Sequence, residues 1–358
     1  VAFLVFEILG INILLLVLKK TNTMDVDIWN YHHMMIVGIL VFFVTQNIVW
    51  AMVATAITAV MTFKFADWTQ PLIEHFFGIP DVTLPTISYT SSIIIAAPLN
   101  WIIDRIPGLN KVNFSIKGVQ KYLGVFGDPM MLGFILGCAM GALALFPFDQ
   151  IFLTGINVAA VMVLMPKMTA MFVEGLMPIS SAAQKFTSEK FGGRALSIGL
   201  DAAVVVGNPE VITTALIMIP VTILLAFILP GNRMMPLADL AVVTFRVALV
   251  VALCRGNVFR SILISIPVMA AILYAGTFAA PFMTEMAQSA GLAFDGQIAS
   301  MAGPSLTQTA IIFWSCISEN AIIVVPALVI AFIAIWYVVE KKITMEKIEA
   351  YAAEYDEM

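Results

Sequence analysis

Several windows of about 18 or more residues carry almost no charged side chains, and they constrain the fold more than any other feature. A helix of that length crosses a hydrocarbon core of about 30 Å. The chain is 61% hydrophobic and 11% charged, whereas soluble domains are roughly half apolar and a quarter charged. Polar and apolar residues do not alternate in these windows as they do in membrane strands. Because a backbone in lipid must satisfy its own hydrogen bonds, the sequence predicts an all-α polytopic membrane protein.

Hydropathy predicts about nine transmembrane helices. The spans are residues 1–18, 34–63, 88–103, 129–146, 150–173, 209–229, 237–253, 259–280 and 310–339. The second span would form a helix of about 45 Å, which is more than one crossing needs. Three explanations stay open for Thr45, Gln46 and Asn47 at its centre: a steep tilt, a break or a polar contact. The chain also begins inside an apolar segment without Met, so we expect it to be N-terminally incomplete.

Basic residues in the connecting loops predict the orientation of the chain, because cytoplasmic loops are rich in Lys and Arg. Basic side chains follow every second predicted span: Lys19, Lys20, Arg105, Lys111, Lys117, Lys121, Lys185, Lys190, Arg194, Arg255, Arg260, Lys341 and Lys342. Residues 147–149 and the predicted loop at 281–309 contain none. The alternation holds through all nine spans and places the C-terminus in the cytoplasm.

Two stretches have polar content unsuited to lipid. Residues 83–92, TLPTISYTSS, carry hydroxyls that include Thr86 and Ser88 around Pro85. Hydroxyls facing lipid cost free energy and the proline disrupts a helix, so we predict a re-entrant hairpin that lines a watery cavity. Residues 197–207 are too short to cross and contain Asp201 between two glycines. An ionisable residue at membrane depth is by default a functional residue.

A repeated Gly-X-Pro pattern marks two helix starts. Gly-Asn208-Pro precedes one apolar run as Gly-Asp128-Pro precedes another, and paired Gly/Pro interruptions point to a transporter's central site. Structural explanations compete with this one. Asp201 would then be a buried carboxylate paired with Arg194 or Arg246, while Asp128 and Glu210 would be helix-start residues favoured by the dipole.

Other chemistry is poorly represented in the sequence. His33 lies beside Trp29 in an interfacial aromatic cluster, and it could also serve a site. Cys138, Cys254 and Cys316 lie far apart in apolar windows and fit buried structural roles. The sequence contains no phosphate-binding loop, metal-ligand cluster or nucleophile elbow, and no basic patch for nucleic acid. We therefore expect no cofactor and no metal, and a solute pathway is the function class that remains.

Several blocks resemble the galactitol-type IIC component of the bacterial phosphoenolpyruvate-dependent sugar phosphotransferase system, a family related to the ascorbate-type IIC proteins. The blocks are VDIWN at 26–30, KFADW at 64–68, DRIPG at 104–108, FGDP at 126–129, LMPKM at 164–168, KFGG at 190–193, IGLDAA at 198–203, LPGNRMMPLADLA at 229–241 and RGNVFR at 255–260. The family has a histidine in one turn and another in its re-entrant motif. At these two positions this sequence has Asn208 and Thr86. The resemblance implies a homodimer in the bacterial inner membrane. Residues 1–358 would form one IIC domain, in which a scaffold and a mobile core are interleaved and carry the sugar by an elevator movement.

The resemblance also implies IIA and IIB partner proteins, with the phosphate supplied by a cysteine of IIB. This subunit would take part in phosphotransfer only within that complex and would itself supply binding and translocation. We expect a sugar-alcohol substrate held by hydrogen bonds near mid-membrane. The predicted substrate-binding residues are Asp201, Asn208, Asp128, Thr86, Ser88 and His33. Two alternatives remain: an ion-coupled secondary transporter of a small polar solute, and a membrane scaffold that does not transport.

Overall fold

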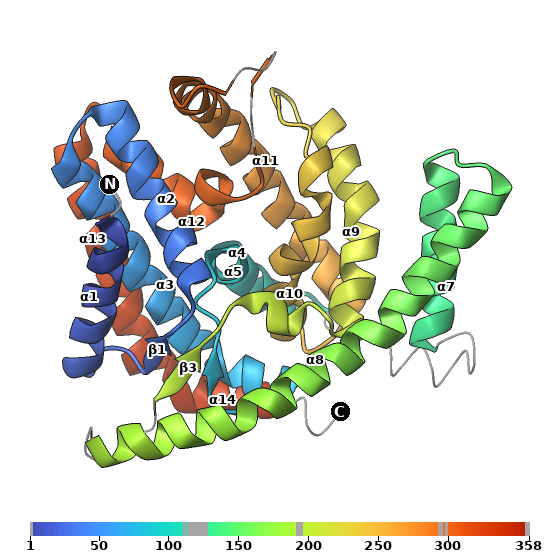
Figure 1. The fold of residues 1–358 in the computed structure, drawn as a ribbon, viewed down its shortest axis with the longest axis horizontal. Coiled ribbons are helices and arrows are strands. Elements are labelled where there is room, and N and C mark those ends of the chain that lie inside the picture. Colours follow the sequence, from blue (N-terminus) through green and yellow to red (C-terminus); the bar gives the residue numbers. More distant parts are fainter. Residues whose placement is uncertain are drawn as a thin grey trace.

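The computed structural model describes residues 3–109, 112, 128–190, 196–292, 296–297 and 300–354. Figure 1 shows helices of very different lengths gathered around a short central helix, α10. The longer α-helices are α1 (Leu4–Val17), α2 (Ile28–Thr45), α3 (Ile48–Phe77), α5 (Ile93–Ile103), α7 (Pro129–Leu143), α8 (Phe148–Lys190), α9 (Pro209–Ile228), α10 (Val243–Leu253), α11 (Val258–Ser289), α12 (Thr307–Ile317), α13 (Ala321–Val338) and α14 (Met345–Ala353). The short elements are β1 (Thr23–Asp25), β2 (Val82–Thr83), β3 (Ser197–Gly199), α4 (Ile87–Thr90), η3 (Ala202–Val205), η4 (Leu237–Val242), η5 (Gly303–Ser305) and η6 (Val339–Ile343).

Two of the predicted spans are each a pair of helices. The span predicted at 34–63 divides between α2 and α3 at Gln46, which adopts a left-handed conformation with φ 51°. The Asn47 side chain then accepts hydrogen bonds from the backbone of Val49 and Trp50 and caps α3. Of the three explanations for the polar centre of this span, a break is therefore correct. The span at 310–339 divides in the same way at residues 318–320, between α12 and α13.

Other boundaries differ because local backbone rules do not fix where a helix stops. Helix α11 runs through Pro281 to Ser289, so the loop predicted to begin at 281 begins later. The span predicted at 237–253 begins as a 3₁₀ turn, and only Val243–Leu253 is α-helical. Helix α8 continues to Lys190, well beyond the end predicted at 173. Lys111, Lys117, Lys121 and Arg194 of the predicted basic loops lie outside the described residues.

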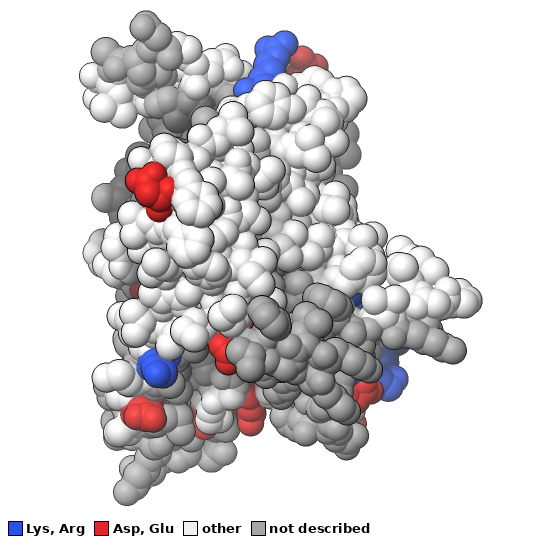
Figure 2. All heavy atoms as spheres, turned by 90° about the vertical axis from the view of Figure 1, so that its right-hand side faces the viewer, with Lys and Arg blue, Asp and Glu red and all other residues white. Residues whose placement is uncertain are grey.

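Among the described residues, six helices are long and apolar enough to cross a membrane. They are α2, α3, the first part of α8, α9, α11, and α13 with its π-helical extension. On the face drawn in Figure 2, most charged side chains lie toward the top and the bottom, and the atoms between them are largely uncharged. The structure therefore confirms a polytopic, mostly helical membrane protein, while the count of nine crossings is not confirmed.

Two arginines of the predicted basic loops pair with acidic residues near other helix ends. Arg260 pairs with Asp104 at 2.7 Å, and Arg255 pairs with Glu354 near the C-terminus. Lys64 donates to the Lys20 carbonyl at 2.8 Å. These contacts join the end of α5 to the start of α11, the turn after α10 to the end of α14, and the turn after α1 to α3. The orientation of the chain in the membrane stays a prediction.

A small parallel sheet is the exception to the all-α prediction. Its strand order is β1-β3-β2, with Asp25 opposite Gly199 and Thr83 opposite the same glycine. A Cβ at Gly199 would lie 2.8 Å from the Asp25 Cα, so this position needs glycine. Strands of two or three residues are too short to show an alternating pattern, which explains why the sequence did not predict them.

Helices α7 and α8 form a hairpin that stands at the right of Figure 1, and α8 then passes diagonally beneath the other helices. A Cβ at Gly137 of α7 would lie 2.8 Å from the Thr154 carbonyl oxygen and 2.9 Å from the Gly155 Cα. Small residues allow two membrane helices to approach this closely. The glycine contact fixes α7 against α8, and α8 in turn reaches the central cavity with Met168.

Helix α10 occupies the centre of the main hydrophobic core. Residues 247–252 are all 0% exposed, so the helix is covered on every side. A buried helix of this kind has a fixed rotation about its axis because each face packs against a different neighbour. The position of Arg246, one residue earlier, is set by this packing.

Candidate functional site

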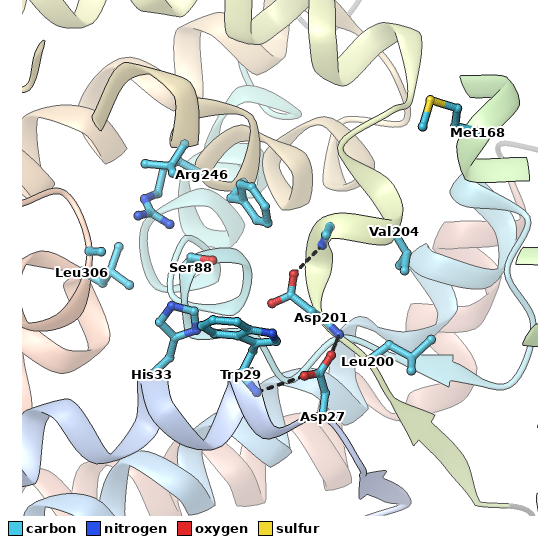
Figure 3. Close-up of a pocket in the computed structure, with 14 residues that line it drawn as sticks. Asp27, Trp29, His33, Ser88, Met168, Leu200, Asp201, Val204, Arg246 and Leu306 are labelled. Atoms are coloured by element: carbon cyan, nitrogen blue, oxygen red, sulfur yellow. Dashed lines mark hydrogen bonds between the residues drawn. The ribbon is translucent and has the colours of Figure 1, made fainter. Parts of the chain in front are cut away.

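A cavity of about 710 Å³ lies between α2, α4, the β3–η3 segment and α10 (Figure 3). Its volume falls within the range of small-molecule sites. The residues that line it are Asp27, Trp29, His33, Ser88, Met168, Leu200, Asp201, Ala203, Val204, Val242, Phe245, Arg246, Ala302 and Leu306. Most of this lining is apolar, and a few polar groups converge on it, which is typical of a ligand site.

The small sheet brings three chain turns to one edge of this cavity. Each strand ends and a helical turn begins within a few residues: Asp27 precedes α2, Thr86 precedes α4 and Asp201 precedes η3. Because the three strands are parallel, their carboxyl ends lie together. In open parallel sheets this edge is where ligands bind. Residues about 60 and 175 positions apart in the sequence thereby meet in one place.

Asp201 is half-buried and its carboxylate is held by local contacts. Its Oδ1 accepts from the Ala203 backbone at 2.8 Å, and its Oδ2 accepts from the Thr86 hydroxyl at 3.3 Å. The backbone N–H of Asp201 donates to Asp27 at 3.1 Å. Each carboxylate oxygen keeps capacity for a further hydrogen bond. No ion pair joins Asp201 to an arginine within the part of the chain that the structure describes.

Thr86 lies behind the cavity wall and connects the three turns. Its hydroxyl donates to Asn30 at 2.8 Å, with Asp201 as the longer alternative, and it accepts from the Ala202 backbone at 2.8 Å. Asn30 in turn donates to Asp25 at 3.1 Å. Thr86 is 0% exposed and is not among the residues that line the cavity, but it contacts Asp201 from behind the cavity wall.

The other hydroxyls of residues 83–92 correct the prediction of a watery lining. Ser88 alone among them lines the cavity, and all of them are buried. Thr90 donates to the Thr86 carbonyl at 3.2 Å and Ser92 to the Arg246 carbonyl at 2.9 Å. The hydroxyls of Thr90 and Ser92 are thus satisfied within the protein, whereas those of Thr83 and Tyr89 are buried without a hydrogen-bond partner among the described residues.

His33 and Trp29 form the wall that α2 contributes. In Figure 3 both rings lie across the cavity from Val204. The Nδ1 of His33 has no hydrogen-bond partner among the described residues, and Trp29 is 65% exposed. An aromatic face beside polar groups suits a sugar derivative, since its carbon skeleton packs on the ring while its hydroxyls reach the polar groups.

Asp128 and Asn208 lie elsewhere. Asp128 caps α7 by accepting from the Met130 backbone at 2.9 Å, and Asn208 caps α9 by accepting from the Val211 backbone at 3.1 Å. Neither is among the described residues that line the cavity. The repeated Gly-X-Pro pattern is therefore a local device for starting a helix, with proline in the first turn. It does not bring these two side chains to Asp201 in this conformation.

Sequence reasoning missed the place of three residues in the cavity lining. It did not single out Asp27, it interpreted Trp29 as an interfacial aromatic residue, and it considered Arg246 only as a partner for Asp201. Arg246 carried a usable signal, because a charge inside an apolar span is seldom structural filler. Asp27 and Trp29 lie in the VDIWN block but carry no local sign of their distant partners. Among the described residues there is no cluster of His, Cys, Asp or Glu that could hold a metal ion. The three free cysteines do not line this cavity.

Comparison with known proteins agrees with the resemblance noted in the sequence. The family model EIIC-GAT, described as a sugar-specific permease component of the PTS system, matches residues 1–297. A permease IIC component of Escherichia coli K12 is 36% identical over 305 residues, covering 85% of this chain and 70% of the relative. The galactitol-specific EIIC component of the same strain is 36% identical over 294 residues, covering 81% of this chain and 65% of the relative. The corresponding protein of E. coli O157:H7 gives the same values.

No solved structure gives a significant match to this chain. The family assignment therefore depends on the sequence comparisons, which cover most of the chain. The match to the family model includes the β1–α2 and β3–η3 segments around the cavity. The chain belongs to the EIIC-GAT family of PTS permease components.

Proposed function

We propose that this protein is a sugar-alcohol permease of the phosphotransferase system, with a galactitol-like substrate bound in the cavity beside Asp201. One observation carries the proposal. The Asp201 carboxylate faces a cavity of about 710 Å³ and is oriented by Ala203 and Thr86, with no cation bound to it among the described residues. A neutral polyol needs acceptors and donors for its hydroxyls and no countercharge.

In this proposal Asp201 accepts hydrogen bonds from the polyol hydroxyls, and Ser88 accepts or donates them. The Nδ1 of His33 has no hydrogen-bond partner among the described residues and can bond a hydroxyl. The cavity wall formed by His33 and Trp29 gives the carbon chain an apolar surface. Thr86 acts by positioning Asp201. Asp128 and Asn208 serve as helix caps in this conformation, and they would reach substrate only if α7 and α9 moved.

Translocation would follow the elevator movement expected for the family. A scaffold and a mobile core, interleaved within one IIC domain of residues 1–358, would move past each other in a homodimer in the bacterial inner membrane. The end that carries Arg255 and Glu354 would face the cytoplasm. There the IIB protein, charged by IIA, would phosphorylate the substrate, while this chain holds the reacting hydroxyl in position.

The direct test uses membrane vesicles that contain the protein, the matching IIA and IIB proteins and a phosphoenolpyruvate supply. A panel of labelled hexitols and pentitols is offered, and the internal product is identified. We expect a hexitol phosphate that disappears when IIB is omitted. Unmodified solute accumulating without IIB would contradict the proposal.

An ion-coupled secondary transporter is the second candidate, and one observation favours it. Asp25, behind the cavity, is 4% exposed, and its Oδ2 has no hydrogen-bond partner among the described residues. Buried carboxylates of this kind carry protons in coupled transporters. This alternative predicts that uptake collapses with the proton or sodium gradient and continues without phosphoenolpyruvate.

A further inference from the structure

Arg246 is a buried guanidinium with unused hydrogen-bond donors. It is 2% exposed and is among the largest fully buried side chains of the protein. Its Nη2 donates to the Met301 carbonyl at 2.8 Å. Its Nε and Nη1 have no hydrogen-bond partner among the described residues. Arginine carries five N–H donors and stays protonated. This residue therefore brings a positive charge and N–H donors without a partner to the cavity that it lines.

The side chain is held firmly in that position. The Ser92 hydroxyl donates to the Arg246 carbonyl at 2.9 Å, which fastens α10 to the segment between α4 and α5. On the other side, Asp239 accepts from the Met301 backbone at 3.0 Å and from the Ser300 hydroxyl at 3.2 Å. These bonds fix the carbonyl that Arg246 contacts. The position of the guanidinium is therefore set by its surroundings. Its Nε and Nη1 donors, which have no partner among the described residues, remain for another acceptor.

The guanidinium of Arg246 faces the cavity. In Figure 3 the guanidinium points toward the space bounded by Ser88, His33 and Leu306, and the Asp201 carboxylate lies on the opposite wall beside Asp27. Asp239 is the one carboxylate whose charge acts on Arg246, but among the described residues it makes no ion pair with the guanidinium. Burying a charge with so little compensation is costly. A bound ligand with acceptor oxygens would satisfy these donors.

We propose that Arg246 is a specificity-determining residue that donates hydrogen bonds to one end of an open-chain polyol whose other end is held by Asp201. The inference depends on the function proposed above and deepens it. The two ends of the cavity have opposite chemistry: the carboxylate accepts and the guanidinium donates. A hydroxyl can do both, so a neutral polyol with a hydroxyl at each end matches both walls, whereas a ligand with one methyl end leaves one wall unsatisfied.

The test compares galactitol with 1-deoxygalactitol, which lacks one terminal hydroxyl, by calorimetric binding to the purified chain in nanodiscs. The wild type is expected to bind the deoxy analogue about 10-fold to 100-fold more weakly, because one wall loses its partner in either binding direction. In Arg246→Met the two ligands are expected to bind equally. The methyl end of the analogue can then lie against Met without loss.

Two further variants keep this test decisive. Arg233→Met removes an exposed arginine outside the cavity, and it should retain the wild-type discrimination. Arg246→Gln replaces the charge by an amide that still donates hydrogen bonds, so it should retain part of the discrimination. This variant carries the test if Arg246→Met does not fold. If the role of Arg246 were purely structural, Arg246→Met would weaken the binding of both ligands by the same factor. The ratio of their affinities would then stay as in the wild type.

The outcomes separate the two proposals. If the wild type binds galactitol and Arg246→Met still prefers it over the deoxy analogue by the wild-type factor, the role of Arg246 is wrong and the proposed function stands. If the correctly folded wild type binds no hexitol, the proposed function fails and this inference fails with it.

Discussion

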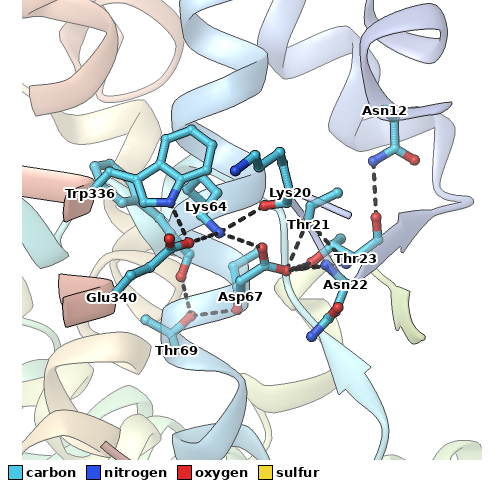
Figure 4. Close-up of polar contacts among 12 residues, drawn as sticks. Asn12, Lys20, Thr21, Asn22, Thr23, Lys64, Asp67, Thr69, Trp336 and Glu340 are labelled. Atoms are coloured by element: carbon cyan, nitrogen blue, oxygen red, sulfur yellow. Dashed lines mark hydrogen bonds and ion pairs between the residues drawn. The ribbon is translucent and has the colours of Figure 1, made fainter. Parts of the chain in front are cut away.

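Two clusters of charged residues, each with at least one buried member, are built in opposite ways in this protein. In the first cluster, shown in Figure 4, Lys64, Asp67 and Glu340 satisfy one another and the chain around them. In the second, the cavity of Figure 3, Asp201 and Arg246 line the same space without a bond between them. Both clusters lie close to the ends of the same small sheet. The difference indicates which charges stabilise the fold and which are left for a ligand.

The Lys64 cluster is satisfied in detail. One oxygen of Asp67 accepts from the hydroxyls of Thr21 and Thr23, each at 2.9 Å, and from the backbone of Asn22 and Thr23. Its other oxygen faces Lys64 at 3.3 Å. Lys64 also pairs with Glu340 at 3.3 Å. The cluster fastens α3 to the start of β1 and to the end of the last membrane helix, so its function is structural.

The largest expected effect is a loss of stability in Asp67→Ala. Removing this carboxylate leaves Lys64 without its buried partner and removes the acceptor of four hydrogen bonds, which is expected to lower the free energy of unfolding by about 3–5 kcal/mol. Denaturant unfolding in detergent measures it. Glu319→Ala, at an exposed carboxylate, is the matched control and should change stability by less than about 0.5 kcal/mol. Equal, small effects of both substitutions would remove the distinction between the clusters.

The next effect is on binding, in Asp201→Asn. The amide keeps the shape and can still cap η3, so stability should change by less than about 1 kcal/mol. Affinity for the polyol should fall about 10-fold to 100-fold, because a charge-assisted hydrogen bond is lost. Calorimetry and uptake of labelled galactitol measure this change. Wild-type affinity in the folded variant would show that Asp201 does not contact substrate.

A smaller and mixed effect is expected for Thr86→Val. This substitution keeps the volume but removes the hydroxyl that bonds Asn30 and accepts from Ala202. It should cost about 1–2 kcal/mol of stability and weaken binding less than Asp201→Asn does, since Asp201 keeps its bond to Ala203. Thr86→Ser should restore both properties. If Thr86→Val binds as weakly as Asp201→Asn, Thr86 itself contacts the ligand.

The smallest effect is expected for Asn208→Ala. Loss of the α9 cap should cost about 1 kcal/mol, and Asn208→Asp should be nearly neutral because aspartate caps equally well. Galactitol affinity should be unchanged in both variants. A selective loss of binding in Asn208→Ala at normal stability would return this residue to the substrate site in another conformation.

Hydropathy and loop charge predicted the membrane class and several of the helices, because membrane burial acts on every residue of a span. They left the break at Gln46 as one of three open explanations, since a left-handed residue in an apolar run leaves the mean hydropathy unchanged. Capping chemistry explained why Asp128 and Asn208 stand before prolines, although the sequence alone could not separate that role from substrate contact.

The cavity could be predicted only in part for a different reason. Asp201 and Ser88 were visible because polar residues are costly at membrane depth. Their convergence with Asp27 and Arg246 depends on the β1-β3-β2 sheet and on the burial of α10. Both are tertiary properties that join distant segments, and no local pattern in the sequence encodes them.

The most direct test of the account is ligand protection of Ala203→Cys, an exposed position in the cavity lining beside Asp201. The variant is made with Cys138→Ala, because the other two cysteines are buried, and its labelling rate with a soluble maleimide is followed with and without galactitol. We expect rapid labelling that saturating galactitol slows at least about 10-fold. A labelling rate that galactitol leaves unchanged, while the same preparation binds galactitol in calorimetry, would place the substrate elsewhere in the protein.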